Sequence, residues 1–170
     1  MRKIAPLLFL GLLSLSLAGC GIFNSDNNTG SNRQIAPTNP NYSKSVFIDE
    51  LRLEIATLKR SFPTTEIVPL RVSVTNTGDK QTNLTYPSGQ KYDFTVTDAS
   101  GAEVWRWSAG RSFTQEVIVV KIKPAENYNF FGRVDAGFLK PGEYTATAWI
   151  TAEELAGEKM SLKFKVFGAS

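Results

Sequence analysis

The stretch "KPGEYTATAWI", residues 140–150, opens on a Pro-Gly turn and then alternates between two kinds of side chain. Tyr144, Ala146, Ala148 and Ile150 fall on one side of the alternation, and Trp149 falls on the other. Successive side chains of a β-strand point to opposite faces, so a period of two predicts a strand with one face in the core. The glycine supplies the backbone freedom that a tight turn needs.

The same alternation returns in three other segments, in which apolar residues, many of them β-branched or aromatic, occupy every second position. These segments are "VPLRVSVTN" (68–76), "KYDFTVTD" (91–98) and "MSLKFKV" (160–166). Turn-forming residues such as Pro87-Ser88-Gly89 and Asp98-Ala99-Ser100-Gly101 separate the runs. Several short strands, each with one polar face, predict an all-β, antiparallel β-sandwich.

In two further segments the type of secondary structure is less clear from the sequence. "FIDELRLEIATLKR" (47–60) has the composition of a helix, but Phe47, Leu51, Leu53 and Ile55 keep an alternating spacing, which favours a strand. "AEELAGEKM" (152–160) contains helix formers that Gly157 interrupts, which favours a loop or a single turn.

Tyr144 directly follows the Pro-Gly turn at the start of its strand. This arrangement resembles the tyrosine corner of Ig-like sandwiches, in which the hydroxyl binds backbone a few residues upstream. We therefore expect a structural role for Tyr144 and an Ig-like sandwich.

The first twenty residues have the pattern of a lipoprotein signal. Arg2 and Lys3 precede an uncharged apolar run that is short for a membrane span, and the run ends in "LAGC", residues 17–20. This tetrapeptide resembles a bacterial lipobox, which predicts a signal peptide over 1–19 and a lipid on Cys20. Cys20 is the single cysteine of the chain, so no disulfide can form within it.

Residues 20–45 are rich in Asn, Ser, Thr, Gly and Pro, which is typical of a flexible tether. One folded domain is expected over 46–170, held through the lipid to a membrane of the bacterial cell envelope. The net charge is +3, and losing Arg2 and Lys3 with the signal leaves +1, so nucleic acid is not an expected partner.

The composition argues against an enzyme. The chain has no histidine, and with Cys20 lipidated there is no thiol nucleophile. We expect no catalytic residue, no metal site and no cofactor. The carboxylates of the predicted strands and turns are interpreted as solvated surface charges: Asp93, Asp98, Glu103, Glu116 and Asp135.

Two of the three tryptophans stand in "EVWRWSAGRSFTQEVI", residues 103–118. The period of two places Trp105 and Trp107 on one side of a strand and Arg106 on the other. We expect Trp105 in the core, whereas Trp107 lies beside the "SAGRS" loop and could belong to the core or to the surface.

"LTYPSGQKYDFTVTDASGAEVWRWSAGRSFTQ", residues 84–115, resembles the BsuPI domain, the intracellular proteinase inhibitor family of Bacillus. The shared features are the "SGQ-Y-F" strand, the "VWRWS" motif, the short Gly loop and "FTQ". The resemblance extends over roughly 47–151 and implies an Ig-like sandwich that inhibits a serine protease. Because this chain carries an export signal, the expected partner is an extracytoplasmic serine protease.

Arg and Trp anchor protein interfaces more often than other residues do, so the hypothesised partner contacts are Arg106, Trp107 and Arg111. Two alternatives stay open at this point. One is a carbohydrate- or cell-wall-binding module that stacks sugars on Trp107 or Trp149, and the other is a structural lipoprotein.

Overall fold

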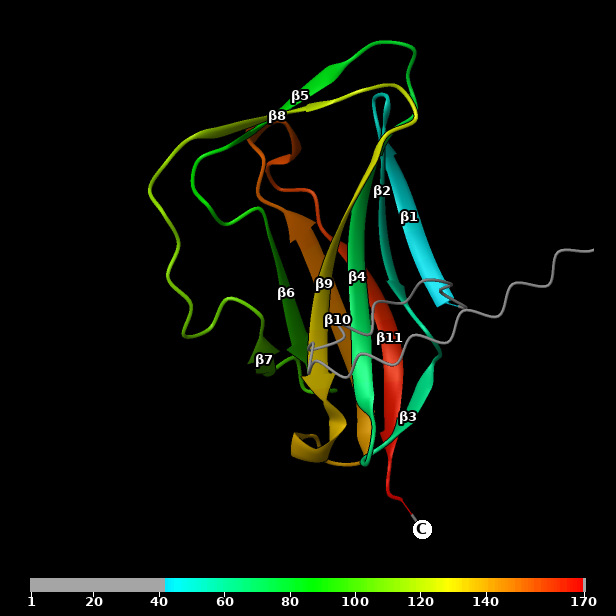
Figure 1. The fold of residues 1–170 in the computed structure, drawn as a ribbon. Coiled ribbons are helices and arrows are strands. Elements are labelled where there is room, and N and C mark those ends of the chain that lie inside the picture. The colour runs from blue at the N-terminus through cyan, green and yellow to red at the C-terminus, as the bar shows by residue number, and fades with distance from the viewer. Residues whose placement is uncertain (1–41, 170) are drawn as a thin grey trace, which may run out of the picture. The chain divides into compact units, whose positions relative to one another are not determined.

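The computed structural model describes residues 42–169, in which two β-sheets pack face to face and a two-stranded ribbon extends beyond them (Figure 1). One sheet has the order β1 (Tyr42–Ile48), β2 (Leu51–Thr57), β4 (Ile67–Asn76), β9 (Asn127–Asp135). The other has the order β3 (Ser61–Pro63), β11 (Met160–Phe167), β10 (Gly142–Ile150), β6 (Tyr92–Thr97), β7 (Glu103–Arg106). Neighbouring strands are antiparallel except for the short pair β3–β11. The expected all-β, Ig-like antiparallel sandwich is confirmed, whereas the signal segment and Cys20 lie outside the described residues.

The core lies between the sheets and is filled by the alternating side chains. In β4 every second residue from Val68 to Val74 is fully buried, and in β11 buried and exposed residues alternate along the whole strand. Burying one Val, Leu, Ile or Phe side chain contributes about 1.5–3 kcal/mol. A shift of register by one residue would turn these side chains toward water, so the alternation also determines the strand pairing.

The segment 47–60 is extended, as expected, but it belongs to two main strands rather than one. β1 ends at Ile48, Asp49 has a positive φ of 50°, and β2 begins at Leu51. The two strands pair as a tight hairpin. The alternation of apolar residues hides this turn because Ile48 and Leu51 lie opposite each other in the hairpin.

The first strand also begins earlier than the predicted domain boundary at residue 46. β1 starts at Tyr42 and pairs with β2 through Ser43, Lys44 and Ser45. The sequence predicts that these polar residues belong to the flexible tether, but the pairing of β1 with β2 uses backbone groups and needs no apolar side chain. Residues 42–45 are therefore part of the sandwich.

A two-stranded ribbon, β5 (Thr82–Tyr86) with β8 (Ile118–Ile122), extends from one end of the sandwich (Figure 1). The buried side-chain amide of Asn76 donates to the carbonyl oxygens of Lys80 at 2.7 Å and Ile122 at 3.0 Å. Glu154 accepts the backbone N–H of Thr85 at 2.8 Å. It belongs to η2 (Glu153–Leu155), a single 3-10 turn in the segment 152–160.

The opposite end carries η1 (Ala136–Phe138), and there the hydroxyl of Tyr144 donates to the carbonyl of Lys140 at 2.7 Å. This is the hydrogen bond of a tyrosine corner. Within residues 42–169, no helix has the length and apolar character needed to cross a bilayer.

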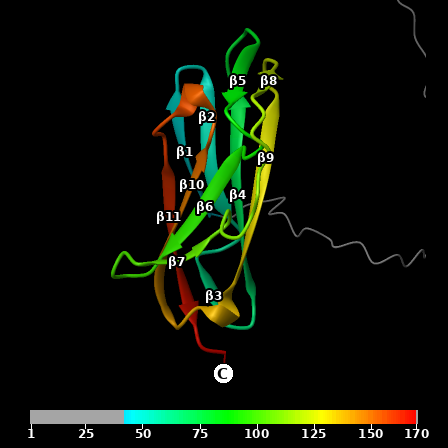
Figure 2. The same ribbon diagram turned by 90° about the vertical axis from the view of Figure 1, so that its left-hand side faces the viewer.

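Strands β7 and β9 are edge strands of different sheets, and they lie at the same side of the sandwich (Figures 1 and 2). The chain leaves β7 through the loop 107–117 before it enters β8. This side is therefore where the "VWRWS" motif, its loop and the middle of β9 meet.

Candidate functional site

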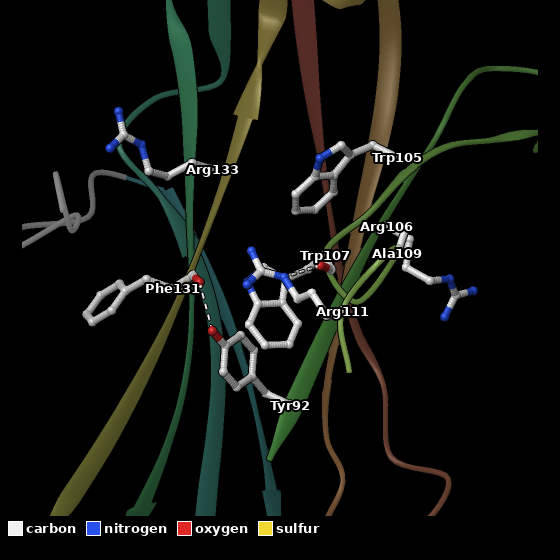
Figure 3. Close-up of a pocket in the computed structure, with 8 residues that line it drawn as sticks. All are labelled: Tyr92, Trp105, Arg106, Trp107, Ala109, Arg111, Phe131 and Arg133. Atoms are coloured by element: carbon white, nitrogen blue, oxygen red, sulfur yellow. Dashed lines mark hydrogen bonds between the residues drawn. The ribbon is translucent and has the colours of Figure 1, made fainter. Parts of the chain in front are cut away.

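An open pocket of about 560 Å³ lies between the 105–111 segment and β9 (Figure 3). Its volume falls within the range of roughly 300–1,000 Å³ that is usual for ligand pockets. The lining residues are Tyr92, Trp105, Arg106, Trp107, Ala109, Arg111, Phe131 and Arg133. The pocket therefore combines aromatic rings with arginine side chains.

A buried carboxylate on β6 holds the loop at this pocket. Asp93 is 2% exposed, so the expectation that it is a solvated surface charge is wrong. Its carboxylate accepts the Ser108 backbone N–H at 3.1 Å, the Ser108 hydroxyl at 2.7 Å and Arg106 Nη1 at 3.3 Å. The chain after β7 folds back over the outward face of β6 and excludes water from Asp93.

Arg106 is engaged within the domain. Its Nε and Nη2 donate to the two carboxylate oxygens of Glu103 at 3.0 and 2.6 Å. Hydrogen bonding with Glu103 raises the pKa of Arg106, and the same contact lowers the pKa of Glu103. The Arg106 guanidinium points away from the rings of Trp107 and Tyr92 (Figure 3). The hypothesised partner contact Arg106 thus serves to fix β7 and the following loop.

Among residues 42–169, no carboxylate holds Arg111 in place. Its Nε donates to the carbonyl oxygen of Trp107 at 2.7 Å, and its guanidinium carbon lies 4.4 Å from the centroid of the Trp107 ring. A cation over an indole face is attracted by the ring quadrupole. Arg111 and Trp107, two of the hypothesised partner contacts, therefore form one unit in the loop.

A row of aromatic rings connects this loop to β9. The ring centroid of Tyr92 lies 4.1 Å from that of Trp107 and 4.8 Å from that of Phe130. The Tyr92 hydroxyl donates to the carbonyl of Phe131 on β9 at 3.2 Å. Burial raises the pKa of Tyr92, while the nearby charge of Arg111 acts in the lowering direction. The row connects the two sheets at their open side.

Trp105 is half-buried and packs against the core, and a glycine on β9 makes room for it. A Cβ added to Gly132 would lie 3.0 Å from Phe94 Cδ2 and 3.4 Å from Trp105 Cη2. Trp107 is also half-buried and packs at the core margin. Both tryptophans therefore combine a core contact with a position in the pocket wall.

Trp149 lies on the outward face of β10, where Lys159 Nζ is 4.8 Å and the Arg106 guanidinium carbon 5.7 Å from its ring centroid. Trp107 likewise has Tyr92, Phe113 and Arg111 as ring partners. Cations contact both tryptophans, and aromatic rings also contact Trp107, so neither is an open platform for stacking a sugar.

Tyr144 does not line the pocket, and Cys20 lies outside the described residues. Sequence reasoning missed Asp93, Tyr92 and Arg133 as parts of the site. Arg133 could have been noticed as an outward charge, since Tyr128, Phe130 and Val134 alternate with it. Within residues 42–169, no three His, Cys, Asp or Glu side chains gather in a group that could hold a metal ion. The site's cations and rings suit binding of a carboxylate or an apolar group.

A protein-family model described as "BsuPI: Intracellular proteinase inhibitor" matches residues 56–155. The chain belongs to this family. The matched region contains every residue of the pocket and excludes β1 and β11. The sandwich is therefore a BsuPI domain, and the "VWRWS" motif lies at the pocket of that domain.

No curated protein matches the chain. Among solved structures, the C-terminal domain of Wzt aligns at 11% identity and a TM-score of 0.46, over 80% of this chain and 86% of that chain. Spo0M, a sporulation control protein from Bacillus subtilis, aligns at 14% identity and 0.41, over 72% and 51%. A β-glucosidase from Listeria innocua aligns at 12% identity and 0.44, over 70% of this chain and 16% of the glucosidase. These likenesses are too distant to inform the function of the BsuPI domain.

Proposed function

We propose that this protein is a noncatalytic, lipid-anchored protein of the bacterial envelope whose BsuPI domain binds and inhibits an extracytoplasmic serine protease. The observation that carries the proposal is the family match over residues 56–155, which includes the whole pocket wall. Cys20 would carry the lipid, and residues 21–41 would connect it to the sandwich.

The loop from Trp107 to Ser112 supports a role in binding. Asp93 fixes its first turn, and Arg111 is stacked on Trp107 before any partner arrives. A contact that is already ordered loses less side-chain entropy on binding, so more of its interaction energy appears as affinity. Arg and Trp are the residue types that dominate binding energies in protein interfaces, and here Arg111 is exposed and Trp107 half-buried.

The anchor supports a location at the envelope. Each methylene of an acyl chain buried in a bilayer contributes about 0.8 kcal/mol, and stable attachment needs more than one chain or a second signal. The lipobox-like "LAGC" and the uncharged run before it support such an attachment. Labelling with a radioactive fatty acid should mark the intact protein and should not mark the Cys20→Ala variant. Equal labelling of both proteins would remove the anchor from the proposal.

Inhibition is tested with the full-length chain in detergent micelles against a panel of subtilisin-like and trypsin-like serine proteases. We expect saturable inhibition with the inhibitor left uncleaved. Arg111→Glu should weaken inhibition, while Arg60→Glu is the matched control because Arg60 precedes β3, at the far edge of the sheet from β7. No inhibition by the folded protein would reject the proposed function. An equal loss of inhibition in both arginine variants would show that the contact with the protease is not at the pocket.

A further inference from the structure

Strand β9 presents a free backbone edge to solvent beside the pocket. It is the last strand of its sheet, and within residues 42–169 no other strand pairs with its outer side. The backbone N–H of Asn76 donates to Glu126 and that of Ala136 donates to Glu66, so the even-numbered residues of this region face β4. In an antiparallel pair the alternate residues face the other way, so residues 127, 129, 131, 133 and 135 turn their backbone groups outward.

This edge is long and weakly protected. β9 has nine residues, and the side chains of Asn129 and Arg133 are exposed. The hydroxyl of Tyr92 reaches the edge at the carbonyl of Phe131, which leaves the outward groups on either side of that residue open. An unpaired edge of this kind is a template for an added strand. β7, the edge of the other sheet, has only four residues and contains a register irregularity between Glu103 and Trp105, so it is the poorer template.

Two arginines place positive charge beside this edge. Arg111 and Arg133 both line the pocket, and within residues 42–169 neither takes part in an ion pair, whereas Arg106 is paired with Glu103 and Asp93. Arg111 extends over Trp107, and Arg133 projects from β9 with its guanidinium directed away from Trp107 (Figure 3), at an exposed position from which this long side chain can turn toward the pocket.

We propose that the free edge of β9 and the pocket together bind an extended acidic segment of the partner protein. The segment adds a strand to β9 through the outward backbone groups around Phe131. One of its carboxylates enters the pocket and is bound by Arg111 and Arg133. Complementary charge selects this occupant, because the two unpaired guanidinium groups favour an anionic segment over a neutral or basic one. The inference rests on the proposed function in taking the natural partner to be a protein.

The test uses the full-length chain in detergent micelles and a synthetic heptapeptide that is acetylated and amidated at its ends. The peptide alternates Thr and Val and carries Glu at its centre. We expect its addition to shift the NMR amide signals of Asn129, Phe131 and Arg133 and to slow their hydrogen exchange. A peptide with central Gln should bind about tenfold more weakly, which corresponds to about 1.4 kcal/mol, because it loses the charge-assisted hydrogen bond to the arginines.

A third peptide distinguishes backbone pairing from simple charge attraction. It keeps the Glu, but the amides on the edge that would face β9 are N-methylated and cannot donate. It should fail to protect the β9 amides. Arg133→Gln and Arg111→Gln should each weaken binding of the Glu peptide about tenfold, and Arg60→Gln should leave binding unchanged. Both pocket substitutions are at surface positions, and thermal unfolding checks that each variant is folded.

Equal binding of the Glu and Gln peptides, or equal binding of the N-methylated peptide, would overturn the inference. So would shifts that leave β9 unaffected. Peptide binding without inhibition of any protease would keep the inference and reject the proposed function. Absence of peptide binding, together with protease inhibition that does not change in Arg133→Gln, would reject the inference and keep the proposed function.

Discussion

The buried carboxylate of Asp93 accepts both the backbone N–H of Ser108, at 3.1 Å, and the hydroxyl of the same residue, at 2.7 Å. One group on β6 therefore determines where the loop after β7 begins. Arg106 also reaches this carboxylate, so the strand end and the loop share one anchor. The position of Arg111 over Trp107 depends on this anchor because both residues lie in the loop.

Asp93→Ala should lower the free energy of unfolding by roughly 2–4 kcal/mol, since each buried donor left without a partner costs about 1–3 kcal/mol. Ser108→Ala removes one hydroxyl contact and should cost about 1 kcal/mol. Urea unfolding of the three proteins measures both differences. Equal stability of Asp93→Ala and the parent protein would contradict an anchoring role.

Gly132→Ala should destabilise the sandwich by about 1–3 kcal/mol, the usual cost of overpacking a core. The new methyl group would come within 3.0 Å of the Phe94 ring and 3.4 Å of Trp105. Gly168→Ala is the control, because a Cβ there meets nothing within 4 Å. Thermal unfolding compares them, and a shift of equal size in both variants would argue against close packing at Gly132.

Tyr144→Phe should cost about 0.5–1.5 kcal/mol, the net contribution of one hydrogen bond. The substitution removes the hydroxyl that donates to Lys140 and keeps the ring stacked on Phe164 at 5.6 Å between centroids. Chemical unfolding measures the loss. Because Tyr144 is outside the pocket, peptide binding and inhibition should stay at the parent level.

Arg111→Gln should raise the pKa of Tyr92 further above its usual value. Burial already raises it, and the charge of Arg111 opposes that effect. A tyrosine with a raised folded-state pKa stabilises the fold below its unfolded pKa of about 10, and this stability is lost as pH rises through the folded pKa. NMR titration of the Tyr92 ring carbon follows the change. An unchanged or lowered pKa would show that Arg111 does not lie close to the phenol.

Local alternation of residues predicted some features of the strands and not others. The alternation in 140–150 and 160–166 predicted strands whose buried faces are as expected, because burial of every second side chain is a local property of a strand. The same pattern could not show the turn at Asp49, since apolar residues stand on both sides of it. It could not place β1 at Tyr42 either, since polar side chains are compatible with a backbone ladder.

The site divides in the same way. The sequence alone determined the sandwich class, the structural position of Tyr144 after its turn, and the loop that carries Trp107 and Arg111, since these depend on side-chain periodicity and turn chemistry. Only the tertiary structure decided that Asp93 is buried, that Arg106 is paired, and that Arg133 joins Arg111 across the open side of the sandwich. Those outcomes depend on which strands become sheet edges and which outward faces a loop covers. Contacts between segments distant in the chain determine both, and no local pattern of residues records them.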